Sequence, residues 1–253
     1  MTWEPDRYLA FQAERDRPAR DLLARLTGAP ARAVDLGCGP GNSTELLMRR
    51  FPEAAVVGVD NAPEMIAAAR TRRPGATFEL GDFADWRGGP VDLIFANAAL
   101  QWVPDHGALL PRLLGQLAPG GTLAVQIPDN LDEPSHRAMR ETAAAGPWAD
   151  RLAGTAEGRA PRHGADWYFE TLRAAGAAPE IWRTTYHHPL AGPAAVAEWF
   201  RSTGLRPYLA PLSAPEQEAF LDAYRAAIAA AYPVLPDGVL LLPFPRLFFL
   251  ARV

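Results

Sequence analysis

The stretch Asp35-Leu36-Gly37-Cys38-Gly39-Pro40-Gly41 decides the fold class of this chain. It closes a short apolar run at 33–36, which we predict to be a buried strand. It precedes a predicted helix, with Asn42 as N-cap and Glu45 as capping-box partner three residues later. Glycines let the backbone turn sharply and approach a ligand without interference from Cβ. A strand, a glycine-rich loop and a capped helix in this order are typical of nucleotide-binding α/β folds.

Strands and helices alternate along the rest of the chain. Further strands are predicted at 55–59, 77–80, 92–96, 121–127, 180–186 and 247–253. Further helices are predicted at 63–72 (with Asn61 and Glu64 repeating the capping signal), 107–117, 166–175, 194–202 and 215–232, and over 8–26 with a break near Pro18. This alternation predicts an α/β fold, with βαβ units on a mostly parallel sheet and helices on both faces.

We expect a single domain over residues 1–253. Its core would comprise about 28–130, 163–190 and 240–253. The helical stretches at about 131–162 and 191–236 are interpreted as insertions that form a cap over the carboxyl edge of the sheet. Ligands of open α/β sheets bind at that edge.

Two nucleotide-like ligands compete for the glycine loop, a dinucleotide and S-adenosylmethionine. The dinucleotide fingerprint is Gly-x-Gly-x-x-Gly, whereas the third glycine here comes one residue early. Asp35 beside the loop would repel a pyrophosphate and attract a ligand that carries an ammonium and a sulfonium group. No arginine lies between Arg32 and Arg49 to serve a phosphate. The loop therefore favours S-adenosylmethionine.

Two further acids follow the next predicted strands. Asp60 ends the second strand about 20 residues past the loop, where a carboxylate can accept both ribose hydroxyls. Asp82 follows the third strand and is placed to take the adenine amino group, with Phe83 against the ring. Cys38 is interpreted as a small residue in a tight turn and not as a nucleophile.

Composition narrows the partners. The net charge is −4, with 49% hydrophobic and 21% charged residues, which gives no broad attraction to nucleic acid or to an anionic membrane. The start lacks a secretory profile, and no apolar run reaches the roughly 18 residues that span a bilayer. With Cys38 as the single cysteine, we expect a cytoplasmic protein that acts on a small molecule.

The chain contains no lysine, since all 25 basic residues are arginine. This excludes a Schiff-base lysine, a P-loop lysine and the Tyr-x-x-x-Lys pair of short-chain dehydrogenases. No spacing of histidines, cysteines and acids suggests a metal site, so no metal is expected.

The glycine loop with Asp60 and Asp82 resembles class I S-adenosylmethionine-dependent methyltransferases over about residues 32–127. That resemblance implies a Rossmann-like, seven-stranded sheet with a final antiparallel strand, here at 247–253. A more specific resemblance, to the trans-aconitate 2-methyltransferase family, is carried by seven segments: 8–11, 14–19, 97–102, 128–130, 182–186, 203–207 and 244–248. The stretch 143–165 does not resemble that family closely.

The resemblance implies transfer of a methyl group to a carboxylate oxygen of a small di- or tricarboxylic acid, most simply trans-aconitate. The expected cofactor-binding residues are Asp35, Gly37, Cys38, Gly39, Asp60, Asn61, Asp82, Phe83 and Asn97. A carboxyl group with a pKa near ~4 is ionised at neutral pH and needs no general base. We therefore expect no catalytic residue beyond those that hold the reactants in line.

An acceptor with three carboxylates needs fixed positive donors, and arginine offers bidentate geometry. Candidates are Arg183, Arg206 and Arg246, with Arg183 and Arg246 favoured and Arg15 and Arg17 as further options. Trp102 and His106 are expected to flank the methyl-transfer point, and Tyr186 to donate to a substrate oxygen.

Three other interpretations stay open. The same scaffold could methylate another small acid or a hydroxyl compound. A nicotinamide-dependent oxidoreductase is opposed by Asp35, the glycine spacing and the absent lysine. A binding protein could retain the cofactor without turnover, although the basic, aromatic cap favours an enzyme.

Overall fold

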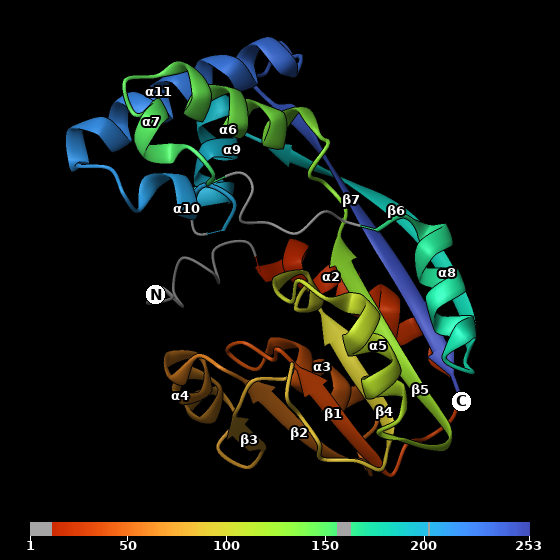
Figure 1. Ribbon diagram of the computed structural model, residues 1–253. Helices are drawn as coiled ribbons and strands as arrows, with labels where there is room; N and C mark the ends of the chain where they lie inside the picture. Colours follow the sequence, from red (N-terminus) through yellow and green to blue (C-terminus); the bar gives the residue numbers. More distant parts are fainter. Residues whose placement is uncertain (1–11, 156–162, 202) are drawn as a thin grey trace. The chain divides into compact units, whose positions relative to one another are not determined.

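The computed structural model describes residues 12–155, 163–201 and 203–253 (Figure 1). Residues 8–11, which begin the predicted N-terminal helix and carry one of the family-like segments, lie outside the described residues, as does residue 202. The chain divides into two compact units. Unit 1 comprises Met1–Pro128, Pro161–Thr184 and Arg246–Val253, and unit 2 comprises Asp129–Ala160 and Thr185–Pro245.

One seven-stranded sheet organises the described chain, in the order β3-β2-β1-β4-β5-β7-β6 (Figure 1). Its strands are β1 (Arg32–Leu36), β2 (Ala55–Asp60), β3 (Thr77–Leu80), β4 (Val91–Asn97), β5 (Leu117–Pro128), β6 (Ala178–Leu190) and β7 (Leu240–Arg252). The first five strands pair in parallel, and β7 runs antiparallel to β5. The predicted Rossmann-like sheet with a closing antiparallel strand is confirmed.

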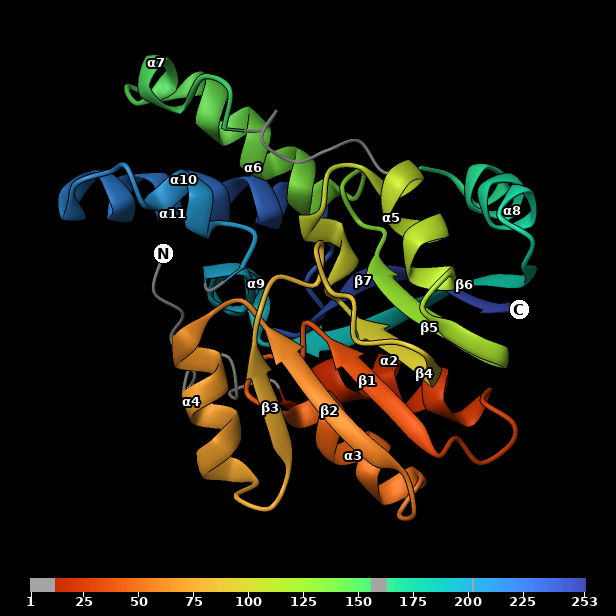
Figure 2. The ribbon, with the colours of Figure 1, turned by 60° about the horizontal axis from the view of Figure 1, so that its bottom comes forward.

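Different helices cover the two faces of the sheet in unit 1 (Figure 2). One face is covered by α5 (His106–Leu114) and α8 (Ala165–Ala174). The other face is covered by α2 (Gln12–Ala24) and α3 (Asn42–Arg50). A further helix, α4 (Pro63–Arg72), packs along β2 and β3. Leu36, Ala96 and Ile127 belong to the buried cluster beneath α5 and α8. Because side chains alternate along a strand, Asp35, Asn97 and Gln126 point to the opposite face, that of α2 and α3.

Both predicted helix starts near the glycine loop are corrected. Gly41, with a left-handed φ of 86°, is the N-cap of α3, and the amide of Asn42 donates to Asp16 instead. Glu45 makes ion pairs with Arg49, Arg72 and Arg73 and does not cap the helix. The N-cap of α4 is Ala62, whose amide is bonded by Asp60 and not by Asn61.

Two boundaries also differ from prediction. Pro18 lies inside α2 without breaking it. The helix predicted at 107–117 ends at Leu114, because Leu117 already pairs with Val91 as the first residue of β5. Asp105 caps that helix, its Oδ1 accepting from the amide of Ala108 at 2.9 Å.

Unit 2 is a helical unit joined to short ends of β6 and β7. Its helices are α6 (Pro134–Ala145), α7 (Ala149–Leu152), α9 (Gly192–Arg201), α10 (Arg206–Leu209) and α11 (Ala214–Ala231). The long α11 packs on α6 and α9 and buries Phe220, Tyr224 and Ile228 completely. These are the helical insertions that the sequence suggests; their placement as a cap over the sheet stays a prediction. Among the described residues, no helix is both long and apolar enough to cross a membrane.

Candidate active site

Asp60, at the carboxyl end of β2, ties the glycine loop to the next helix. Its Oδ2 accepts from the amide of Gly39 at 2.9 Å, and its Oδ1 accepts from the amide of Ala62 at 2.9 Å. Burial raises the pKa of this half-buried carboxyl, and the two amides counteract that effect. A carboxylate oxygen has two lone pairs, so each oxygen can also accept from a ribose hydroxyl.

Asp35 is fully buried at the end of β1, beneath the start of α3. Its Oδ2 accepts from the hydroxyls of Ser43 at 2.7 Å and Thr44 at 2.6 Å. Burial raises the pKa of Asp35 to about 6, although these two hydroxyls lower it. The carboxyl is therefore mostly ionised at neutral pH and keeps a negative charge beside the loop.

Two glycines of the loop have different surroundings. A Cβ added at Gly37 would lie 2.4 Å from the Cβ of Ala99, so this glycine is required by close packing. A Cβ added at Gly39 would meet nothing within 4 Å, so the backbone there faces open space. Phe83 is buried and lies 3.5 Å from the position of that Gly37 Cβ. The loop can thus bring its backbone close to a ligand at Gly39.

The other expected cofactor residues differ in exposure. Asp82 is exposed and its Oδ1 accepts from the amide of Ala84 at 2.8 Å, while Asn61 is exposed after β2. Cys38 is buried, and burial raises the pKa of its thiol far above the ordinary value. A thiol in this state is a poor nucleophile.

The groups around the loop fit S-adenosylmethionine. Within the described part of the chain, Asp35 Oδ1 and Asn97 Oδ1 are buried acceptor atoms with no hydrogen-bond partner. They lie on one face of the adjacent strands β1 and β4, where Asp35 pairs with Phe95. Two unfilled acceptors suit a ligand that brings an ammonium group, and Asp60 suits its ribose. These residues could hold the cofactor.

His106, expected near the substrate, is buried and bonded through both ring nitrogens. Nε2 lies 2.7 Å from the carbonyl oxygen of Leu100, and Nδ1 lies 2.7 Å from the hydroxyl of Tyr168. A carbonyl only accepts, so Nε2 carries the hydrogen, and in the neutral ring Nδ1 accepts from Tyr168. This geometry favours a structural role that fixes the 3₁₀ turn η1 (Leu100–Trp102), where Trp102 is 51% exposed.

The two favoured arginines point to opposite faces of the sheet. Arg246 is buried in β7, two residues from Phe248, so the two share a face. Trp182 stacks on Phe248 with ring centroids 5.0 Å apart and planes 7° apart, which puts Trp182 on that same face. Its neighbour Arg183 is exposed and points the other way. Arg246 therefore shares the face of Asp35 and Asn97, and Arg183 does not.

The remaining substrate candidates belong to unit 2. Tyr186 is buried, with its ring stacked against His188 at 6.4 Å between centroids. Arg206 opens α10 and is half-buried.

Two functional candidates were missed at the level of sequence. Gln126 lies in the otherwise apolar run 123–127, and a lone polar residue in such a strand could have drawn notice. Tyr168 gives no such signal, because its bond to His106 joins residues 62 positions apart.

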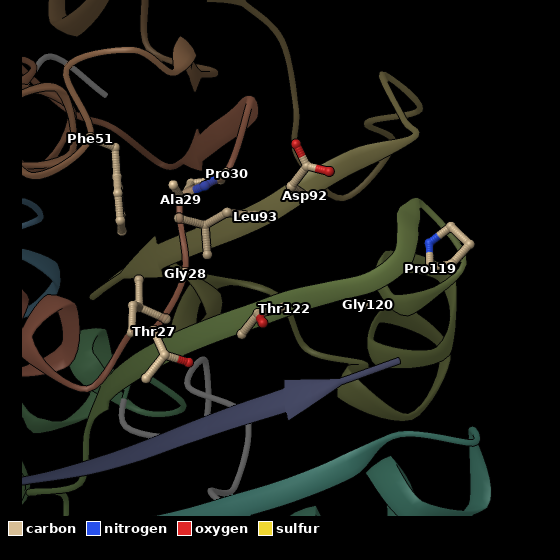
Figure 3. A pocket seen from close by; sticks show the side chains of 11 residues that line it. Thr27, Gly28, Ala29, Pro30, Phe51, Asp92, Leu93, Pro119, Gly120 and Thr122 are labelled. Carbon is tan, nitrogen blue, oxygen red and sulfur yellow. The ribbon is translucent and has the colours of Figure 1, made fainter.

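A hollow of about 230 Å³ lies at the amino ends of β1, β4 and β5 (Figure 3). Thr27, Asp92 and Thr122 lie around it. The carboxylate of Asp92 already has hydrogen-bond partners in the protein, since its Oδ2 accepts from the backbone amides of Ala31 and Arg32 at 2.8 Å each. Ligands of such sheets bind at the opposite, carboxyl ends of the strands, so this hollow has no part in the candidate site.

Known proteins are similar to this chain in sequence and in fold. The family described as "Methyltransferase domain" matches residues 33–121. The trans-aconitate 2-methyltransferase of Methylobacterium nodulans is 58% identical over 99% of this chain and 98% of its own length. That of Yersinia pestis is 54% identical, with the same coverage of both chains. The YcgJ protein of Bacillus subtilis superposes with a TM-score of 0.61 over 95% of this chain and 98% of its own, at 12% identity.

A seven-stranded sheet with this strand order, carrying acids at successive strand ends beside a glycine loop, defines a class I methyltransferase. Its methyl donor is S-adenosylmethionine. At 54–58% identity over nearly the whole length of its relatives, the chain belongs to the trans-aconitate 2-methyltransferase family.

Proposed function

We propose that this enzyme transfers the methyl group of S-adenosylmethionine to a carboxylate oxygen of a small di- or tricarboxylic acid, and that trans-aconitate is its acceptor. The observation that carries the proposal is the 58% identity to a trans-aconitate 2-methyltransferase across 99% of the chain. Buried Arg246, on the same sheet face as Asp35 and Asn97, is an independent physical reason to expect an anionic acceptor.

The reaction makes modest chemical demands on the protein. S-adenosylmethionine supplies an electrophilic methyl group when bound. The acceptor carboxylate is already ionised at neutral pH, so no side chain needs to remove a proton. The residues of the site would act by orientation, which can contribute as much as ~7–11 kcal/mol to the lowering of the barrier. Asp35, Asn97 and Asp60 would hold the donor, and Arg246 would hold the acceptor.

Arg246 is a better candidate than Arg183 for the acceptor carboxylate. Burial makes an arginine–carboxylate interaction stronger than it is at the surface, and Arg246 is only 6% exposed, whereas Arg183 is exposed. Arg206 and Tyr186 stay predictions from unit 2, and Trp102 stays a prediction from η1.

The test is a methyl-transfer assay with labelled donor over a panel of small acids and hydroxyl compounds. Trans-aconitate should be methylated faster than a monocarboxylate of similar size. Arg246→Ala should lower kcat/KM, with a loss of transition-state stabilisation of roughly 2–4 kcal/mol and little change in donor binding. Arg183→Ala is the matched control and should retain activity. Preferred turnover of an uncharged acceptor would refute the carboxylate assignment and leave the methyltransferase class intact.

We further propose a cytoplasmic location and a small carboxylate as the partner, with neither nucleic acid nor a membrane. The single, buried Cys38 suits a reducing compartment, and a net charge of −4 gives nucleic acid no general attraction.

A further inference from the structure

Gln126 is a buried polar side chain to which the proposed chemistry assigns no role. It is 0% exposed and stands in β5 between Val125 and Ile127. Its Oε1 accepts from Nη1 of Arg246 at 3.4 Å. Its Nε2 is buried and has no hydrogen-bond partner among the described residues. Buried polar groups in native proteins are normally satisfied, so a buried amide with an unfilled donor requires an explanation other than packing.

Three neighbouring strands of unit 1 place polar side chains in one row. Asn97 of β4 and Gln126 of β5 are register partners, so their side chains share a face. Arg246 of β7 pairs with Pro128, two residues beyond Gln126, and therefore lies on that face as well. The row Asn97–Gln126–Arg246 thus connects a candidate cofactor residue with the candidate acceptor arginine.

The chemistry of the amide explains why glutamine stands in the middle of this row. A carboxylate at this position would form a charge-assisted bond with the guanidinium and offset its positive charge. The amide oxygen accepts a hydrogen bond from Arg246 and adds no negative charge. Gln126 therefore restrains the guanidinium without competing electrostatically with an incoming anion.

We propose that Gln126 is a positioning residue that orients Arg246 toward a carboxylate of the acceptor, and that its neutrality sets the preference for acceptors with several carboxylates. This inference rests on the proposed function, because it concerns how the proposed acceptor is bound. It adds a specificity-determining residue that acts through Arg246.

Two substitutions separate orientation from charge. Gln126→Glu keeps an acceptor for Arg246 and adds a negative charge. Gln126→Met keeps the approximate size and removes the acceptor. The matched control is Gln116→Glu, since Gln116 directly precedes β5 at its other end and its Oε1 accepts from the amide of Gly89 at 3.2 Å. It adds the same charge beside the same strand, away from Arg246.

The readouts are KM and kcat for trans-aconitate, the same constants for a monocarboxylate, and the Kd of S-adenosylhomocysteine by calorimetry. Gln126→Glu should raise KM for trans-aconitate roughly 10- to 100-fold and reduce the preference over the monocarboxylate. Gln126→Met should raise that KM by a smaller factor, roughly 3- to 10-fold. The Kd of S-adenosylhomocysteine should stay within about twofold in both, and Gln116→Glu should resemble the unmodified protein.

Several outcomes would overturn the inference. One is an unchanged KM and acceptor preference in both Gln126 variants. Another is a uniform fall of kcat for all acceptors together with weaker cofactor binding, which would indicate a structural role only. If Gln126→Glu does not fold, the KM of the uncharged Gln126→Met variant for trans-aconitate is the deciding measurement, and an unchanged value would overturn the inference. An unmodified protein that methylates no di- or tricarboxylate would refute the proposed function and this inference together, whereas an active protein with unaffected variants would refute this inference alone.

Discussion

The backbone amide of Gly39 donates to a carboxylate oxygen of Asp60 at 2.9 Å, although the two residues are 21 positions apart. The bond joins the tip of the glycine loop to the end of β2. The second oxygen of Asp60 holds Ala62 at the start of α4. One side chain therefore ties the loop to the start of α4, and its remaining lone pairs are the proposed acceptors for a ribose.

Asp60→Ala should weaken binding of S-adenosylmethionine by roughly 1.5–3 kcal/mol, the range for hydrogen bonds to a charged group. Calorimetry measures the change. Asp92→Ala is the matched control, because Asp92 also accepts from two backbone amides, but at the amino end of the sheet. Asp92→Ala should lower stability and leave cofactor affinity unchanged; an equal loss of affinity in both variants would show that the effect is not local to the loop.

Asp35 should make the protein less stable as the pH rises from about 4 to about 6. Its pKa is about 6 in the folded protein against 3.8 ordinarily, so the folded state holds this proton more tightly than the unfolded chain. The stabilising contribution is complete below the ordinary pKa and is lost as the pH rises through the folded value. The loss is on the order of 3 kcal/mol.

Asp35→Asn isolates this contribution, since an amide oxygen can still accept from Ser43 and Thr44. The variant should be more stable than the unmodified protein at pH 7, with the difference shrinking toward pH 4, while cofactor binding weakens. Urea unfolding at several pH values measures it. Glu45→Gln should show the opposite trend. Burial raises the pKa of Glu45, but hydrogen bonds from Arg72 and Arg73 together lower it more, so the net pKa lies below the ordinary value. The stabilising effect of Glu45 is therefore lost as the pH falls. A pH-independent difference for Asp35→Asn would contradict the buried-charge account.

Gly37→Ala and Gly39→Ala should have different consequences. Both residues have a left-handed φ, of 71° and 54°, so each substitution carries roughly 1–2 kcal/mol of backbone strain. At Gly37 the new methyl group also collides with Ala99, and the protein should lose much more stability. At Gly39 the methyl group enters open space, so the larger effect should fall on cofactor affinity. Thermal unfolding with and without S-adenosylhomocysteine distinguishes them, and equal stability losses would refute the distinction.

Tyr168→Phe should cost about 1–3 kcal/mol of stability, because Nδ1 of buried His106 loses its donor from Tyr168 while the ring stack on Phe249 is kept. Since His106 also holds Leu100, kcat should fall through movement of η1. Tyr224→Phe, which removes a buried hydroxyl bonded to Ser135 in unit 2, is the control and should affect stability more than kcat. Full activity of Tyr168→Phe would argue against the role assigned to His106.

Period and spacing were sufficient to predict a mostly parallel sheet, because its strands are short apolar runs separated by helices and turns. The closing antiparallel strand was predicted from the family resemblance. Period and spacing also identified Asp60 as the acid at the end of β2. The helix caps were predicted wrongly at Asn42 and Asn61, since the caps depend on the left-handed Gly41 and on Asp60 reaching forward from its strand. In both helices another residue, Gly41 or Ala62, occupies the N-cap position, and neither residue makes a capping hydrogen bond through its own side chain, so the local preference for asparagine does not decide the start.

Contacts between distant segments could not be predicted in this way. The burial of Asp35 under the Ser43 and Thr44 hydroxyls follows from the docking of α3, which a one-dimensional pattern does not encode. The opposite orientations of Arg183 and Arg246 depend on the registers in which β6 and β7 join the sheet. Sequence similarity places both in family-like segments and cannot tell which one faces the acids.

The place of β7 has a consequence for biosynthesis. It lies between β5 and β6 in the sheet, yet it is the last of the seven strands in chain order. On the ribosome, β6 has no strand to pair with and the edge of β5 stays open until β7 is synthesised. About 110 residues separate β5 from β7, and their translation takes roughly 6–22 s. An open strand edge is a template for pairing with other chains, so the nascent protein passes through a period in which a holding chaperone would matter most.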